Sequence, residues 1–103
     1  MTVIKGPSEV RKYRLDFSQV PEVADNGESI SSIVTEPVVV ANAAGITETG
    51  LTLTAGAVSS NKVSFTVSAG TLQKAYRIYC LVRTSASNDL EAYFDLRIEK
   101  TVS

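Results

Sequence analysis

The feature that most constrains the fold is a strict two-residue alternation of apolar and polar side chains near the C-terminus. From Leu90 to Ile98 every second residue is apolar, and the residues between them are charged or tyrosine. Successive side chains of a β-strand point to opposite faces, so this period predicts a strand with one face in the core. Helical periodicity does not recur in the chain. The alternation therefore indicates an all-β protein.

Further strands are predicted on both sides of this one. The alternation is clear over residues 12–17 and 62–68, residues 75–83 are apolar on both faces, and weaker strands are expected at 29–35, 38–42 and 51–55. A strand that is apolar on both faces is central in its sheet or partly covered by a partner. Pro37 lacks an N–H group and is expected at a break or an edge. A single helical turn over 22–26, begun by Pro21, is the one helical candidate.

About seven short strands at roughly 10–14-residue spacing predict an immunoglobulin-like antiparallel β-sandwich. The 103 residues are enough for one domain. We place the sandwich at residues 11–103 and interpret residues 1–10 as either a loose N-terminal arm or an edge strand. The aromatic residues expected in its core are Tyr13, Phe17, Phe65, Tyr76 and Phe94.

The composition argues against catalysis, cofactors and metal sites. The chain has no His, which removes Ser-His-Asp and Cys-His arrangements and His-ligated metals. Cys80 has no second cysteine to pair with, and its place in the alternation predicts a buried, inert thiol. Carboxylates such as Asp16 and Asp95 fall on outward strand faces rather than in a cleft. The segment 25–28 lacks the spaced oxygen ligands of a calcium loop and is interpreted as a turn.

Charge and hydropathy restrict the partners. A net charge of −1 gives no attraction toward nucleic acid or anionic lipid, and no apolar stretch is long enough for a membrane span. We expect no nucleic-acid or membrane partner and a chain that folds in the cytoplasm. Four basic residues near the N-terminus are the candidate partner-binding residues: Lys5, Arg11, Lys12 and Arg14. They could bind an acidic protein surface, or they could protect a sheet edge from unwanted strand pairing.

Several segments also carry a family resemblance. They are Lys5–Val10, with its Lys-x-Pro-x-Glu-Val pattern, Tyr13–Ser18, Gly27–Ser32, and, in the C-terminal half, Val63–Thr71, Tyr76–Ile78, Val82–Ser85 and Phe94–Ile98. In these positions the chain resembles small immunoglobulin-like proteins encoded among the head and tail structural genes of tailed bacteriophages. The resemblance implies a virion component without enzymatic activity, made in the cytoplasm of the host bacterium.

Within that class, the first expectation is a capsid decoration or cement protein on the outer surface of the head. Its partners would be the major capsid protein or other virion proteins, and a homotrimer is one arrangement on the shell. The alternatives are a structural component of the neck or tail, and a module that binds a host glycan through loops near Asn26, Asn42 or Asn88. The absence of Trp and an aromatic content of 7% argue against the glycan alternative.

Overall fold

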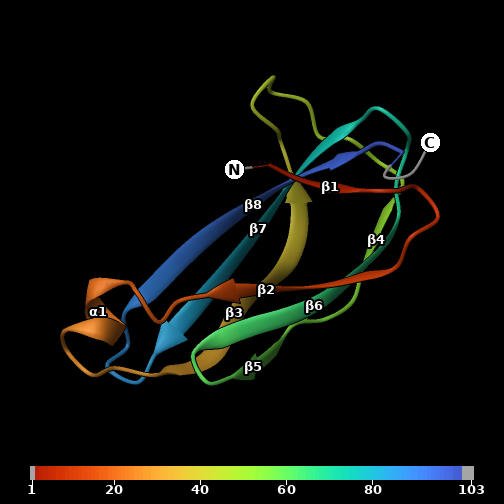
Figure 1. Cartoon of the computed structure of the whole chain (residues 1–103). Coiled ribbons are helices and arrows are strands. Elements are labelled where there is room, and N and C mark those ends of the chain that lie inside the picture. Colours follow the sequence, from red (N-terminus) through yellow and green to blue (C-terminus); the bar gives the residue numbers. More distant parts are fainter. Residues whose placement is uncertain (1, 101–103) are drawn as a thin grey trace.

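The computed structural model describes residues 2–100 and consists of two β-sheets packed face to face (Figure 1). The elements in chain order are β1 (Thr2–Lys5), β2 (Arg11–Asp16), α1 (Pro21–Ala24), β3 (Ile30–Val40), β4 (Leu51–Leu53), β5 (Ala57–Ser59), β6 (Lys62–Ala69), β7 (Ala75–Thr84) and β8 (Asp89–Ile98). Met1, which begins the predicted N-terminal segment 1–10, and residues 101–103, which end the predicted sandwich domain 11–103, lie outside the described residues.

The sheet order is that of an immunoglobulin-like sandwich. Sheet A has the order β1-β8-β7-β3, and sheet B has the order β2-β6-β4, with β5 also pairing with β6. All of these pairs are antiparallel except β1–β8, which is parallel. The predicted fold class is therefore confirmed, with one parallel strand pair added at the edge of sheet A.

The strand boundaries differ from the predicted ones in the middle of the chain. The two weak strands expected on either side of Pro37 are one edge strand, β3, whose register shifts between Thr35 and Val38. A bulge at this edge accommodates the missing N–H group without ending the strand. Of the two interpretations of residues 1–10, the structure has the edge strand, because β1 lies at the edge of sheet A. The short strand β5 was not predicted, because a segment of three residues carries too little alternation to be recognised.

The core lies between the sheets and is built from the alternating residues of three strands. Its fully buried side chains are Val63, Phe65 and Val67 of β6, Tyr76, Ile78, Cys80 and Val82 of β7, and Leu96 and Ile98 of β8. Four further buried residues complete it: Leu15 of β2, Phe17 directly after β2, Val23 of α1 and Ile30 of β3. Alternation in each strand thus directs one set of side chains into the sandwich, as the sequence predicted.

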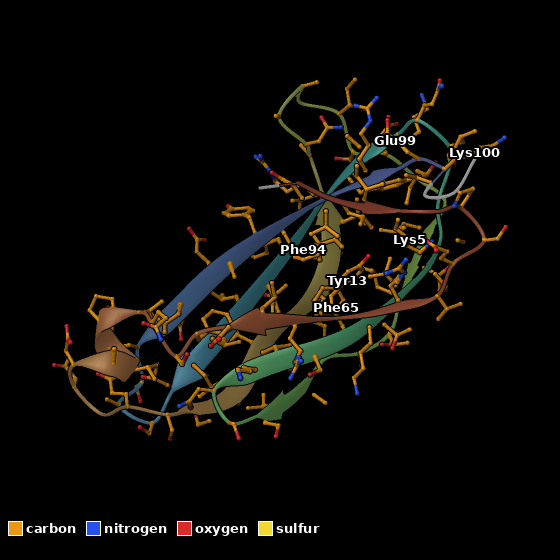
Figure 2. All side chains as sticks on the ribbon, in the orientation of Figure 1. Lys5, Tyr13, Phe65, Phe94, Glu99 and Lys100 are labelled. Atoms are coloured by element: carbon orange, nitrogen blue, oxygen red, sulfur yellow. The ribbon has the colours of Figure 1, made fainter. Side chains whose placement is uncertain are left out.

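The aromatic residues are not equally buried. Phe17, Phe65 and Tyr76 are at most 2% exposed, whereas Tyr13 and Phe94 are only partly buried. Tyr13, Phe65 and Phe94 gather between the sheets, and the Phe65 and Phe94 rings meet edge to face with centroids 5.9 Å apart (Figure 2). Phe94 lies one residue before the part of β8 that pairs with β1, so no strand among residues 2–100 lies beside it on that side.

This difference in burial gives a stability prediction. Phe65→Ala is expected to lower the free energy of unfolding by about 3–5 kcal/mol, the usual cost of removing a fully buried phenylalanine. Phe94→Ala is expected to cost clearly less, because part of its ring is already in contact with solvent. Urea unfolding of both variants beside the parent chain measures the two values, and equal losses would contradict the described burial.

Candidate functional site

The outer face of sheet A carries a compact group of aromatic and basic side chains. Tyr79 of β7 lies directly across from Tyr93 of β8, and their ring centroids are 5.2 Å apart. Arg77, two residues along β7, places its guanidinium carbon 5.7 Å from the centre of the Tyr93 ring. Val38 of the neighbouring strand β3 lies across from Tyr79. We call these four residues, Val38, Arg77, Tyr79 and Tyr93, the tyrosine face.

The tyrosine face is accessible to a partner. Tyr93 is 56% exposed and Val38 is 43% exposed, although both are large apolar or aromatic residues. Tyrosine and arginine are the residue types most enriched at protein interfaces, because each combines a large contact area with polar groups at its tip. The apolar character of the outer side of residues 75–83, noted in the sequence, is therefore located on one accessible sheet face.

Ion pairs hold the side chains around the tyrosine face in place. Arg77 donates two hydrogen bonds to Asp95, at 2.8 and 3.3 Å, and this contact lowers the pKa of the Asp95 carboxyl group. The Tyr79 hydroxyl donates to Glu91 at 3.2 Å. Surface ion pairs add little stability, but they reduce the number of conformations that a partner must select. The result is a face whose charges are largely paired and whose aromatic rings are positioned.

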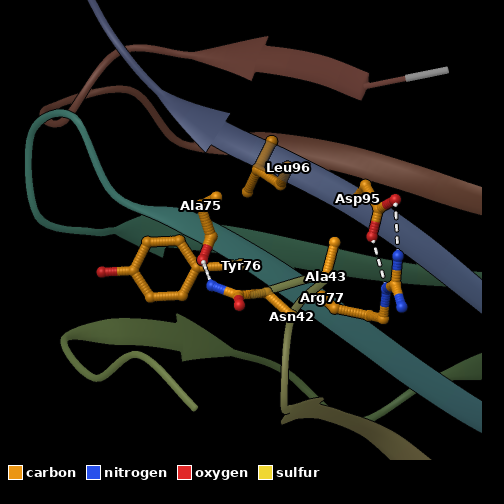
Figure 3. A pocket seen from close by; sticks show the side chains of 7 residues that line it. All are labelled: Asn42, Ala43, Ala75, Tyr76, Arg77, Asp95 and Leu96. Atoms are coloured by element: carbon orange, nitrogen blue, oxygen red, sulfur yellow. Dashed lines mark hydrogen bonds and ion pairs between the residues drawn. The ribbon is translucent and has the colours of Figure 1, made fainter. Parts of the chain in front are cut away.

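A small hollow lies beside this face (Figure 3). Its volume is about 110 Å³, and its lining includes Asn42, Ala75, Tyr76, Arg77 and Asp95. Asn42 is occupied structurally: its amide nitrogen donates to the Ala75 carbonyl oxygen at 3.0 Å, and its side-chain oxygen accepts the Ala44 and Ile46 N–H groups. Ligand pockets are usually several times larger, about 300–1,000 Å³. The hollow is therefore a surface depression and not a built ligand site.

The four basic residues predicted to bind a partner do not share one surface. Lys5 is fully buried, and its ammonium group donates to the carbonyl oxygens of Gly6 and Ala69, each at 2.7 Å (Figure 2). Burial lowers the pKa of this ammonium group. The placement of Lys5 on an exposed surface is thus wrong, because in β1 it alternates with Ile4 and so points inward beside Val3.

The other three basic residues are exposed on or beside β2. Arg11 forms an ion pair with Glu9 at 3.0 Å, while Lys12 and Arg14 extend from the outer face of sheet B. Lys5 instead joins β1 in sheet A to the end of β6 in sheet B. The basic cluster therefore separates into one buried contact between the sheets and a positively charged edge strand.

The remaining candidates take structural roles. The Glu28 carboxylate accepts hydrogen bonds from the Thr84 hydroxyl at 2.5 Å and from the Asn88 amide at 3.0 Å, and these bonds lower its pKa. Asn88, like Asn42, is thus engaged within the chain. Among residues 2–100, no group of three or more His, Cys, Asp or Glu side chains could hold a metal ion. Within the same range, no helix is long and apolar enough to cross a membrane.

Comparison with known proteins supplies the family. Residues 5–97 match the model of a family described as the podophage GP4 fiber-tail adaptor protein gp77. The chain belongs to this family. It is therefore a structural protein of the phage virion, in agreement with the resemblance seen in the sequence. No curated protein matches the chain.

The family also bears on the position within the virion. Its description refers to the tail and not to the head, so capsid decoration, the first expectation, has no support from this match. The alternative, a structural component of the neck or tail, fits better. The sequence placed Tyr79 and Tyr93 on outward faces but gave no means to see that they lie across from each other, because that depends on the register of β7 and β8.

The state of Cys80 gives a second prediction. Its side chain is fully buried, and burial raises the pKa of the thiol to about 11. Because the thiolate is the reactive form, we expect no reaction with iodoacetamide at pH 8 in the folded chain and complete reaction after unfolding in urea. Mass spectrometry of the two samples measures the modification. Rapid modification of the folded chain would show that Cys80 is accessible.

Proposed function

We propose that this chain is a non-catalytic adaptor of a podophage tail that binds a tail fibre protein through the tyrosine face. The observation that carries the proposal is the family match over residues 5–97, which covers nearly the whole described fold. What the family's description says of its members, a connection between fibre and tail, is here proposed for this chain. The sequence analysis expected the major capsid protein or other virion proteins as partners, with a homotrimer as one arrangement. The present proposal takes the second of these partner classes, other virion proteins, in the form of a tail component and a fibre.

The chemistry of the chain supports an adaptor rather than an enzyme. The one thiol is buried with a raised pKa, and the carboxylates that surround the tyrosine face are held in ion pairs or hydrogen bonds. A catalytic group needs a perturbed pKa together with access to a substrate in a cleft. The tyrosine face offers instead a broad contact area with positioned rings, which suits a lasting protein contact.

Electrostatic arrangement also favours this face over the outer face of sheet B. Arg77–Asp95 and Arg83–Asp89 are paired at 2.8 and 2.9 Å, so a partner that covers them does not have to bury isolated charges. Burying a paired charge costs less than burying a single one. Tyr79 and Tyr93 can then provide most of the contact area at a small cost in side-chain entropy.

The proposal predicts the effect of removing one ring. Tyr93→Ala is expected to weaken binding to the tail fibre protein of the same phage about 30-fold, corresponding to an interface hot spot of about 2 kcal/mol. Biolayer interferometry with the purified fibre protein measures the affinity. The matched control is Val10→Ala, since Val10 is 68% exposed and directly precedes β2 of sheet B, whereas the tyrosine face belongs to sheet A. Its affinity is expected to equal that of the parent chain.

Two outcomes would contradict the proposal. Unchanged affinity of both Tyr93→Ala and Tyr79→Ala would place the fibre contact elsewhere on the chain. Absence of any binding to the fibre, together with antibody labelling of the head rather than the tail in electron micrographs, would return the protein to capsid decoration.

A further inference from the structure

The free edge of β2 is a part of the molecule that the tyrosine face does not involve. In the usual immunoglobulin arrangement the first strand lies beside the second and covers its edge. Here β1 pairs with β8 in sheet A, and β2 stands at the border of sheet B with β6 as its pairing partner (Figure 1). The position beside β2 is thus without a strand in the described chain.

The backbone of β2 presents hydrogen-bonding groups at this edge. The Phe17 N–H group donates to the Asn61 carbonyl oxygen at 3.0 Å, so the backbone N–H and C=O groups of Phe17 point toward the β6 side of the strand. Because N–H and C=O groups alternate between the two sides of a strand, those of Lys12, Arg14 and Asp16 point away from β6. The register from Arg11 to Asp16 runs without a bulge, so these groups form a regular row.

The other edges of the sandwich are less suited to pairing. The edge strand β3 has three register shifts and contains Pro37, while β1, β4 and β5 have only three or four residues each. Bulges, proline and shortness are the devices that prevent a sheet edge from accepting another strand. The six residues of β2 have none of these, and their protection rests on charge alone.

Charge makes the edge selective. Lys12 and Arg14 lie on the outer side of β2, and Asp16 follows on the same side. Acidic side chains placed across from Lys12 and Arg14 would be attracted to these two residues. Asp16 disfavours an acidic residue at its own position, which would fix the register of an arriving strand.

The inner side of the same edge is apolar and incompletely covered. Tyr13 points between the sheets, where its ring centroid is 4.9 Å from that of Phe94, and both rings are only partly buried. The Tyr13 hydroxyl is itself buried with no hydrogen-bond partner among the described residues. Every second side chain of an arriving strand would extend over this part of the core, so apolar residues are favoured at those positions.

We propose that the β2 edge binds an extended segment of a tail protein in which acidic and apolar residues alternate, by adding it as a further strand to sheet B. The proposal rests on the adaptor function, because an adaptor must hold two partners on separate surfaces. The tyrosine face belongs to sheet A, and this edge belongs to sheet B. Strand addition of this kind obtains affinity from backbone hydrogen bonds and specificity from alternate side chains.

The test uses a short soluble peptide, Val-Glu-Val-Glu-Val, whose two glutamates can face Lys12 and Arg14 without facing Asp16. The control is Val-Lys-Val-Lys-Val, and the two are called the glutamate peptide and the lysine peptide. Titration of the whole isotope-labelled chain by nuclear magnetic resonance is expected to shift the amide signals of Lys12, Arg14 and Asp16 most strongly, and only with the glutamate peptide. Failure of the glutamate peptide to bind, or shifts centred on the tyrosine face, would overturn the proposal.

Two comparisons separate backbone pairing from charge attraction. Arg14→Ala removes only the guanidinium, whereas Arg14→Pro also removes an N–H group that points away from β6, so the ladder with β6 is retained. We expect Arg14→Pro to bind the glutamate peptide about tenfold more weakly than Arg14→Ala, as for loss of one ordinary hydrogen bond. Lys12→Glu with Arg14→Glu is expected to reverse the preference toward the lysine peptide. The charge-matched control, Lys74→Glu with Lys100→Glu, alters exposed lysines outside β2 and is expected to bind like the parent.

The outcomes are separable from those of the adaptor proposal. If Arg14→Pro fails to fold, as seen by circular dichroism, the charge reversal alone decides: an unchanged peptide preference overturns strand addition. Glutamate-peptide binding at β2 in a chain that does not bind the fibre would support this edge and contradict the adaptor function. Binding of the fibre by a chain whose β2 edge does not bind the glutamate peptide would support the adaptor function and contradict strand addition at β2.

Discussion

The register between β7 and β8 is the constraint on which most of the molecule depends. It runs without interruption from Ala75 across from Arg97 to Arg83 across from Asp89. The same nine pairs place Ile78, Cys80 and Val82 in the core and Tyr79 and Tyr93 on the outer face. A shift of one residue would exchange the two sets, so packing and the accessible aromatic group are determined together. This coupling explains how a chain with few aromatic residues presents a defined surface.

The sequence predicted the long strands well because their signal is repeated. In 90–98 and 62–68 every second residue is apolar, and burial of Val63, Phe65 and Val67 follows directly from that period. The signal fails where few residues carry it. In β3, a proline that usually ends a strand lies instead at an irregular edge, where the neighbouring pairs hold the strand together.

The candidate site was less predictable than the fold, for reasons that particular residues illustrate. Lysine is rarely buried, so the sequence favours a surface position for Lys5, yet its ammonium group donates hydrogen bonds to two carbonyl oxygens inside the sandwich. The preceding residues, Val3 and Ile4, are both apolar, so no alternation in the sequence indicates that Lys5 faces inward. The contact between Arg77 and Tyr93 depends on two strands lying side by side, and composition gives no information about such pairs.

The parallel pairing of β1 with β8 has a mechanical consequence. Thr2 lies across from Asp95 and Lys5 lies across from Ile98, so the chain enters at one end of this pair and leaves at the other. A force that draws the two ends of the described chain apart acts along both strands in opposite senses, and it loads their hydrogen bonds simultaneously instead of one after another. The hydrogen bond from the Lys5 ammonium group to the Ala69 carbonyl oxygen attaches β1 to sheet B, at the end of the pair where β8 leaves it. Resistance to shear under tension is thus built into the way the first strand is attached.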